Sequence, residues 1–380
     1  MTAPGHDFSA QALPPWRRAV LKVGSSQLAV DGEGLSERHA RGLADFVSIS
    51  TASGREVVIV SSGAVAAGRA ILGPASRTGA AMAERQALAA LGQAPVIALW
   101  QRLLQRPVAQ VLLTHDDLRN RRRYLNARGT LQALLSMGAI PVVNENDTVS
   151  VDELKLGDND NLAAVVAALV DADALFIATD IDGLYSADPR MQPDARPVEQ
   201  VDAITPAVFA MAGEAGSSSG TGGMRTKLEA ASKAAAAGIE TFLFNGSMAD
   251  TVAALGEGTL FGTRFRPART RLAARKYWLR NVPLEAGAIV VDPGAAVAIV
   301  ENGASLLPGG IIDAEGDFRR GDMIQVVLRD GRLGAVARGV TQYSAKDIRR
   351  IAKRHSRDIE KLLGYSYGGS VIHRDDLVLS

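Results

Sequence analysis

Short apolar runs alternate with Ala- and Leu-rich stretches from Ala19 to about Gly262. The runs are apolar on both faces, which is typical of mostly parallel strands covered by helices on each side. The predicted strands are Ala19–Val23, Val57–Ser61, Val108–Leu113, Pro141–Asn144, Ala174–Ala178 and Thr241–Asn245. The predicted helices are Glu37–Ser53, Ala80–Gln105, Tyr124–Met137, Asp160–Leu169 and Met224–Ala237. This alternation predicts an α/β domain.

The pattern changes at a basic stretch, Thr263–Arg280, which Pro267 interrupts. Beyond it, short alternating runs between Gly-rich turns predict a small β-barrel or sandwich. Its expected strands are Ala288–Val291, Ala296–Glu301, Met323–Leu328 and Gly334–Gly339. A final helix is expected to begin at Ser344, to end before Gly364 and to bury one side. That side carries Ile348, Ile351, His355, Ile359 and Leu362.

The chain is therefore expected to have four parts: a disordered leader over residues 1–15, an α/β domain over 16–262, a linker over 263–285 and a β domain with its C-terminal helix over 286–380. The leader contains Pro and Ala and has no apolar signal-peptide core. No run approaches the roughly 18 consecutive apolar residues of a membrane span. We therefore expect a cytoplasmic protein without a membrane partner.

Composition narrows the chemistry. With 42 Lys and Arg against 41 Asp and Glu, the chain is nearly neutral and has no bulk attraction to nucleic acid. The chain has no cysteine, which excludes disulfides, thiol nucleophiles and thiolate zinc sites. The five histidines show no metal-ligand spacing, so no protein-held metal is expected.

Polar side chains are crowded between residues 144 and 161. Asn144-Glu-Asn-Asp147 follows a predicted strand, and Gly157-Asp-Asn-Asp-Asn161 opens a predicted helix. Open α/β sheets bind ligands beyond the carboxyl ends of their strands, where these groups are expected to lie. The alternative is a pair of Asn/Asp turns with a helix cap.

A Gly-rich segment, Gly220–Lys227, opens another predicted helix. Backbone N–H groups of such a loop can approach an anion, and the helix N-terminus favours negative charge. The spacing fits neither the Walker A loop nor the dinucleotide fingerprint. It predicts a phosphate loop of another kind, with a flexible surface linker as the alternative.

Three more strand ends carry polar groups: Lys22 to Ser26, Ser61 to Ala64, and Thr179-Asp180. Each has an ordinary explanation, such as a snorkelling lysine or an Asp-Gly turn. Ser62 lacks the preceding Gly and the His of a hydrolase nucleophile, so it is interpreted as a ligand contact. Two lysines, glycines and carboxylates at one sheet edge suit phosphoryl transfer.

The motifs in this order resemble the amino acid kinase family, and within it the glutamate 5-kinases, from about Trp16 onward. The resemblance rests on Lys22-Val-Gly-Ser-Ser, Ser61-Ser-Gly-Ala-Val-Ala-Ala-Gly-Arg69, Asn144-Glu-Asn-Asp147, Gly157-Asp-Asn-Asp-Asn-Leu162, Thr179-Asp180, Gly183-Leu-Tyr-Ser-Ala-Asp-Pro189 and Gly220–Lys227. The C-terminal part resembles a PUA domain through Leu306–Ile311, Phe318–Asp322 and Leu363-Gly-Tyr-Ser-Tyr. One departure is Arg85, where such kinases often carry Lys.

The resemblance implies a three-layer αβα fold with a mostly parallel central sheet and a small C-terminal PUA-like β-barrel. It implies ATP-dependent phosphorylation of the γ-carboxylate of L-glutamate, with Mg²⁺ on the nucleotide, as the first step of proline biosynthesis. Proline as an inhibitor, a homo-oligomer and transfer of the product to the next pathway enzyme are further implications.

Site roles follow from the same resemblance. Lys22 and Lys227 are assigned to the transferring phosphoryl group, and Asp160 to holding both lysines. Asp147 is assigned to the substrate ammonium, and Asn159 and Ser62 to the other polar groups of glutamate. The implied ATP-binding residues are Lys22, Thr179, Asp180, Thr221, Gly222, Gly223, Met224, Arg225, Thr226 and Lys227.

Two rival functions stay open. The chain could phosphorylate N-acetylglutamate, aspartate, carbamate or a nucleoside monophosphate instead, although a carboxylate at Asp147 suits a free ammonium better than an acylated nitrogen. The PUA-like domain could bind RNA through basic residues of its last helix. A solvated helix face is the favoured interpretation of those residues, which are Arg349, Arg350, Lys353, Arg354 and Arg357.

Overall fold

The structure is a computed structural model. It describes residues 7–29, 34–73, 81–149, 159–213, 223–267, 287–329 and 335–380, together with 269–270, 273–274, 276, 279 and 284. The chain divides into two compact units. The first comprises Met1–Arg119 and Thr130–Arg271, and the second comprises Asn120–Gly129 and Leu272–Ser380. Each unit is described by itself.

The first unit is built on an eight-stranded sheet in the order β4-β5-β3-β2-β6-β10-β12-β9. The strands are β2 (Arg18–Val23), β3 (Glu56–Ser61), β4 (Val108–Leu113), β5 (Ile140–Glu145), β6 (Ala174–Thr179), β9 (Gln200–Val201), β10 (Glu240–Asn245) and β12 (Gly262–Phe265). The six from β4 to β10 in this order are parallel, and β12 runs antiparallel to β10. The mostly parallel sheet confirms the predicted fold class.

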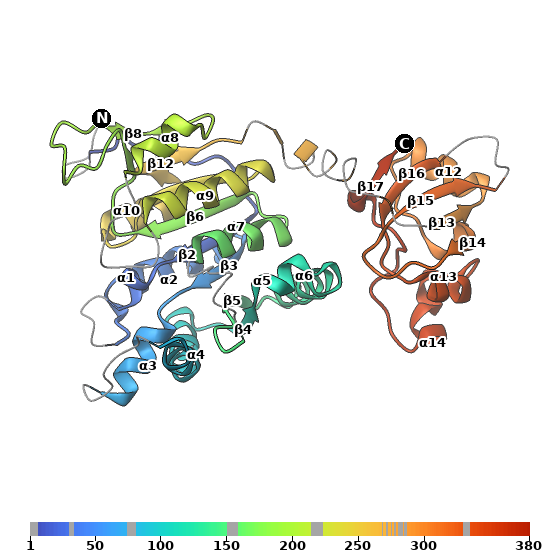
Figure 1. Cartoon of the computed structure of the whole chain (residues 1–380), viewed down its shortest axis with the longest axis horizontal. Coiled ribbons are helices and arrows are strands. Elements are labelled where there is room, and N and C mark those ends of the chain that lie inside the picture. Colours follow the sequence, from blue (N-terminus) through green and yellow to red (C-terminus); the bar gives the residue numbers. More distant parts are fainter. Residues whose placement is uncertain are drawn as a thin grey trace. The chain divides into compact units, whose positions relative to one another are not determined.

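Helices cover both faces of this sheet, and Figure 1 shows α7 and α9 side by side on one of them. The helices of the first unit are α1 (Ser25–Leu28), α2 (Glu37–Ala52), α3 (Ala64–Leu72), α4 (Met82–Leu104), α5 (His115–Arg119), α7 (Asn159–Leu169), α8 (Pro206–Met211), α9 (Met224–Ala236) and α10 (Ala249–Gly256). Helix α6 (Arg121–Ser136) is divided between the two units at Thr130. Buried residues of α2, α4 and α10 pack in one core cluster with Leu21 and Val23 of β2. On the opposite face, α7 packs against β2 and beside α9.

The order of the strands in the sheet reverses at β2. Its neighbours are β3 on one side and β6 on the other, so the chain order reverses there. Successive strand residues point to opposite faces, so Leu21 and Val23 enter the core cluster while Lys22 points to the face of α7. Such a reversal of strand order is where open α/β sheets bind ligands.

The ends of the first unit differ from the predictions. The leader was predicted to be disordered over residues 1–15, yet Phe8 is buried and β1 (Gln11–Ala12) pairs with β11 (Thr259–Leu260). The ring of Phe8 packs edge-on against Tyr185, which explains the order of this segment. At the other end, Thr263–Phe265 was assigned to the linker, but these residues belong to β12 and pair with β10. Backbone pairing with an apolar strand outweighs the basic composition.

The second unit contains a five-stranded sheet in the order β14-β13-β15-β16-β17, in which only the β13/β15 pair is parallel. The strands are β13 (Gly287–Val291), β14 (Ile311–Gly316), β15 (Met323–Leu328), β16 (Ala335–Val340) and β17 (Leu377–Leu379). Ile289, Ile324 and Tyr343 are fully buried in its core. Leu125 of the Asn120–Gly129 segment packs in a smaller cluster with Met323 and Val340.

Two elements of the second unit differ from the predictions. Ala296–Glu301, predicted as a strand, lies largely in helix α12 (Pro293–Val300), because Asp292 caps Ala295 N–H and Pro293 starts the helix. The predicted helix over 344–363 is broken into α13 (Ala345–Ile351), a 3₁₀ turn at Ser356–Asp358 and α14 (Ile359–Leu363). His355 is exposed and caps that turn instead of entering the buried stripe.

The ends of this helical region agree with the predictions. Ser344 forms a capping box with Asp347, and Gly364 ends α14 in the left-handed conformation.

One helix of the described residues, α4, is long and apolar enough to span a membrane by length and composition alone. The sequence-based expectation of no membrane span did not anticipate it. Leu88, Val96, Leu99 and Trp100 of this helix are buried inside the unit, and 39% of its apolar window is buried. The predicted cytoplasmic location stays a prediction.

Candidate active site

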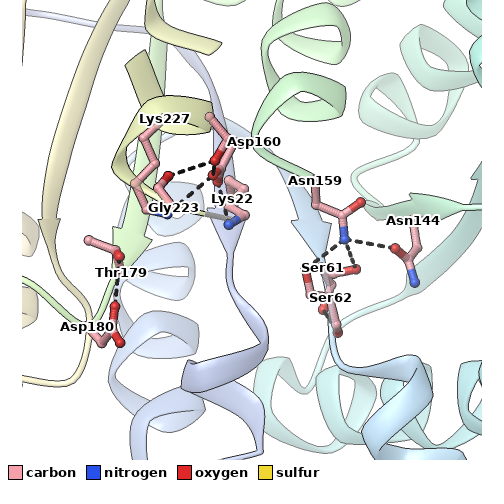
Figure 2. A network of polar contacts seen from close by, with 11 residues as sticks. Lys22, Ser61, Ser62, Asn144, Asn159, Asp160, Thr179, Asp180, Gly223 and Lys227 are labelled. Atoms are coloured by element: carbon pink, nitrogen blue, oxygen red, sulfur yellow. Dashed lines mark hydrogen bonds and ion pairs between the residues drawn. The ribbon is translucent and has the colours of Figure 1, made fainter. Parts of the chain in front are cut away.

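The carboxyl ends of the parallel strands place polar residues along one edge of the sheet. Lys22 and Ser61 lie at the ends of β2 and β3, and Thr179 ends the neighbouring β6. The N-terminus of α7 brings Asn159 and Asp160 to the same edge (Figure 2). Consecutive residues of one helix therefore contact groups that arrive from different strands.

Asp160 joins two lysines. Its Oδ1 is paired with Lys22 Nζ, and its Oδ2 lies 3.3 Å from Lys227 Nζ. Asp160 is 0% exposed, and each lysine is 6% exposed. Because burying an unpaired charge is costly, the carboxylate and the ammonium groups stabilise one another. The two lysines and one carboxylate together carry one more positive charge than negative.

Helix α9 holds Lys227 in place. Gly223 is its N-cap residue, and no side chain caps the helix there. The Thr226 hydroxyl lies 2.7 Å from Gly223 O and 3.0 Å from Asp160 Oδ2. Thr226, predicted to bind ATP, therefore directs its hydroxyl toward Asp160. The N-terminus of α9 adds backbone N–H groups and a dipole that favour an anion.

Asn159 organises a second, uncharged group of side chains. Its Nδ2 donates to Ser62 Oγ at 2.7 Å and to Asn144 Oδ1 at 3.1 Å. Ser61 O lies 3.4 Å from the same nitrogen. Figure 2 shows this group beside the Lys22 and Asp160 pair, with the two linked through α7. The structure thus brings predicted residues Ser62 and Asn159 into direct contact.

Asp147 lies just after β5 and is half-buried. Burial and the nearby Glu145 carboxylate raise the pKa of Asp147 to about 6, against a smaller opposing effect of Arg85. A carboxyl group that is costly to ionise gains most from a cationic partner. Asp147 is therefore suited to accept a ligand ammonium group.

The remaining predicted residues lie on the α9 side of the site. The Thr179 hydroxyl donates to Asp180 Oδ1 at 3.1 Å, with Thr179 buried and Asp180 exposed. Arg225 is exposed and pairs with Glu229 along the helix, away from Asp160, and Met224 is half-buried. Thr221 and Gly222 lie outside the described residues, as do Gly157 and Asp158.

Two residues of α4 that the sequence analysis did not predict hydrogen-bond to the group around Asn159. The Trp100 indole Nε1 donates to Ser61 Oγ at 2.9 Å, and Gln93 Oε1 lies 3.4 Å from Asn144 Nδ2. Both residues are on α4, far from the site in sequence. No local sequence motif links Gln93 and Trp100 to the strand ends, so their contacts could be recognised only in the folded structure.

The described residues contain no group of three or more His, Cys, Asp or Glu side chains that could hold a metal ion. The arrangement instead offers two buried lysines and a helix N-terminus. These are the features that proteins use to hold phosphate groups.

Comparison with known families agrees with this geometry. The chain matches the amino acid kinase family over residues 17–245 and the PUA domain over residues 287–363. The predicted association of an αβα kinase fold with a C-terminal PUA domain is confirmed.

Close relatives share nearly the full length. A glutamate 5-kinase of Xanthomonas oryzae pv. oryzae (strain KACC10331 / KXO85) is 72% identical over 361 residues, 95% of this chain and 100% of its own. One of Xanthomonas campestris pv. campestris (strain 8004) is 71% identical over 362 residues, with the same coverage. One of Xylella fastidiosa (strain 9a5c) is 66% identical over 380 residues, 100% of this chain and 99% of its own. The chain therefore belongs to the glutamate 5-kinases of the amino acid kinase family.

Proposed function

We propose that the chain transfers the γ-phosphoryl group of ATP to the γ-carboxylate of L-glutamate, forming γ-glutamyl phosphate and ADP, the first step of proline biosynthesis. The observation that carries the proposal is the buried Lys22, Asp160 and Lys227 group beside the neutral Asn159 group at one sheet edge. The names of the close relatives support the choice of substrate.

The nucleophile needs no general base. The glutamate side chain has a pKa of about 4.3 and is already ionised at neutral pH. The obstacle is the repulsion between this carboxylate and the triphosphate. Lys22 and Lys227 reduce it by placing two ammonium groups where the transferring phosphoryl group passes, and they stabilise the charge on its oxygens.

Asp160 is assigned a positioning role. Its two oxygens face different lysines, so one carboxylate fixes the separation of both ammonium groups. The buried setting keeps these charges from being screened by water. Preorganised charges need little rearrangement when the phosphoryl group transfers.

The nucleotide is assigned to the side of the site formed by β6 and α9. Its phosphates would meet the α9 N-terminus from Gly223 onward and the predicted residues Thr221 and Gly222, with Thr179 and Asp180 nearby. Mg²⁺ is assigned to the triphosphate, where it usually keeps several waters and is held through phosphate oxygens. When bound, the ion neutralises phosphate charge.

L-Glutamate is assigned to the side formed by β3, β5 and α7. Asp147 would pair with its ammonium group, and Ser62 and Asn159 would hydrogen-bond its other polar groups. N-Acetylglutamate lacks the cationic nitrogen that would compensate the half-buried Asp147. The free amino acid is therefore the preferred substrate.

A coupled assay of ADP release with ATP, Mg²⁺ and L-glutamate tests the proposal. Turnover with L-glutamate is expected to exceed turnover with N-acetyl-L-glutamate, L-aspartate and carbamate at equal concentrations. Turnover on one of these alternatives with none on L-glutamate would refute it.

We further propose that proline inhibits the enzyme, that the chain forms a homo-oligomer, and that the product passes to the next pathway enzyme. These points rest on the resemblance to the relatives. Inhibition is expected to appear as a rise in the apparent KM for glutamate when proline is added to the same assay. If proline leaves the apparent KM for glutamate unchanged, the proposed inhibition is wrong, and the other proposals are unaffected.

A further inference from the structure

A polar contact lies inside the apolar core beneath the uncharged half of the site. Trp100 is fully buried and belongs to the core cluster that also contains Ile59, Leu99 and Leu104. Its indole Nε1 donates to Ser61 Oγ at 2.9 Å, and Ser61 is also fully buried. An indole N–H without an acceptor in such a core would be strongly unfavourable, so this pair fixes both side chains.

Ser61 passes this constraint to the next residue. Its hydroxyl accepts from Trp100 and donates to Ser62 O at 3.2 Å. The Ser62 N–H donates to Val23 O at 3.1 Å. Hydrogen bonds therefore fix both the N–H and the C=O of Ser62. Its hydroxyl oxygen accepts from Asn159 Nδ2.

The backbone of the Ser61–Gly63 turn can change its conformation little. Gly63 follows with a φ of +98°, and a Cβ there would lie 3.3 Å from Leu28. Gly63 is also the N-cap of α3, whose Ala64 and Ala67 are buried in the same core. The orientation of the Ser62 hydroxyl thus depends on a turn that the core defines.

We propose that Trp100 is a positioning residue for the amino acid substrate. Through the Ser61 hydroxyl, its indole N–H holds the Ser61–Gly63 turn so that Ser62 and Asn159 present a preset pair of hydrogen-bonding groups. The inference rests on the proposed function, because it assigns Ser62 to L-glutamate. Lys22 and Lys227 pair with Asp160, whereas the indole hydrogen bond ends on Ser61. Loss of the indole is therefore expected to affect binding of the amino acid more than binding of the nucleotide.

Steady-state kinetics of the full chain with Trp100→Phe, Ser61→Ala and the double variant test this inference. Trp100→Phe removes one neutral hydrogen bond and Ser61→Ala removes two. The KM for L-glutamate is therefore expected to rise roughly three- to tenfold in each, while the KM for ATP stays within about twofold. The double variant is expected to be no worse than the more affected single variant, because both changes break one connection.

Leu99→Val is the matched control. Leu99 neighbours Trp100 in the same core cluster, and the change shortens a buried side chain without touching the hydrogen bond. It is expected to lower the melting temperature and leave both KM values unchanged. Ser61→Ala keeps the test open if Trp100→Phe does not fold, because it leaves the indole in place.

Two outcomes would overturn the inference. In one, wild-type enzyme phosphorylates glutamate but Ser61→Ala leaves the KM for glutamate unchanged. In the other, both KM values rise together in proportion to the loss in melting temperature, as expected of a purely structural core residue. If wild-type enzyme instead shows no turnover with glutamate, the proposed function has failed first, and the positioning role of Trp100 for that substrate fails with it.

Discussion

The two halves of the candidate site differ in how their side chains interact. Around Asp160, ionic groups are buried almost completely and carry a net positive charge. Around Asn159, amides and hydroxyls form neutral hydrogen bonds. The two organising residues are consecutive in α7, so one helix N-terminus sets both halves. In the proposed reaction, the charged group would neutralise the phosphoryl oxygens and the neutral group would orient the amino acid.

The largest effect is expected from breaking the charged half at its centre. Asp160→Asn leaves two buried ammonium groups facing one another, so the free energy of unfolding should fall by about 3–5 kcal/mol. Denaturant unfolding measures this. Asp188→Asn is the control, because Asp188 pairs with exposed Arg190 and its loss should change stability little. Equal effects of both changes would contradict the buried-charge explanation.

Removing one lysine should affect chemistry more than binding of the amino acid. Lys227→Met is expected to lower kcat about 100- to 1000-fold, because a charge directed at the transition state is lost. Arg41→Met on α2 is the control, since Arg41 is exposed, is paired with Glu37 and has no assigned role in the site. A rise in the KM for glutamate without a loss of kcat in Lys227→Met would reverse the assigned roles.

The amino acid half of the proposed site, to which Asp147 is assigned, should respond in KM. Asp147→Asn is expected to raise the KM for L-glutamate about 10- to 100-fold, which is the range for loss of a hydrogen bond to a charged group. The change in kcat should be smaller. Asp116→Asn, at an exposed position after β4, is the control and should leave the KM unchanged. A loss confined to kcat in Asp147→Asn would remove Asp147 from substrate binding.

A pH profile sharpens the same assignment. The pKa of Asp147 is raised to about 6, so this group loses its charge as the pH falls through 6, whereas free glutamate keeps its side-chain carboxylate charge. The KM for glutamate in wild-type enzyme should therefore rise between pH 7 and pH 5. The Asp147→Asn variant should lack this rise, and an identical rise in both proteins would assign the titration to another group.

The stability of the ligand-free protein is expected to fall, not to rise, as Asp147 ionises. Because the folded pKa of Asp147 exceeds its ordinary value of 3.8, ionisation of this group costs stability, and the cost grows as the pH rises from about 4 to about 6. Without ligand, Asp147→Asn should therefore raise the melting temperature above pH 6 and have no effect below pH 4. A lower melting temperature at pH 8 would show that the carboxylate stabilises the fold.

Local patterns predicted most of the first unit. The apolar runs from Ala19 to Val23 and from Ala174 to Ala178 lie within β2 and β6, because strands buried on both faces leave a continuous apolar signal. A similar apolar run at Ala296–Glu301 led to a wrong strand prediction, because Asp292 and Pro293 start a helix there. The buried position of Phe8 could not be predicted, because its partner Tyr185 is distant in sequence.

The candidate site shows the same limit. Polar crowding at strand ends identified Asn159, Asp160 and Lys22, since each lies at the end of a recognisable element. Thr226 was assigned to ATP, although its hydroxyl faces Asp160. Trp100 carried no signal, because a tryptophan in an apolar helix is indistinguishable from any core residue until the fold places Ser61 beside it.

The most direct test of the bipartite site is calorimetric binding of L-glutamate to the Lys227→Met variant. The two halves share α7 but hold different ligands, so this variant should bind L-glutamate with wild-type affinity although its turnover is nearly lost. Loss of glutamate binding in Lys227→Met, in a protein that remains folded, would contradict the division of the site into a phosphoryl half and an amino acid half.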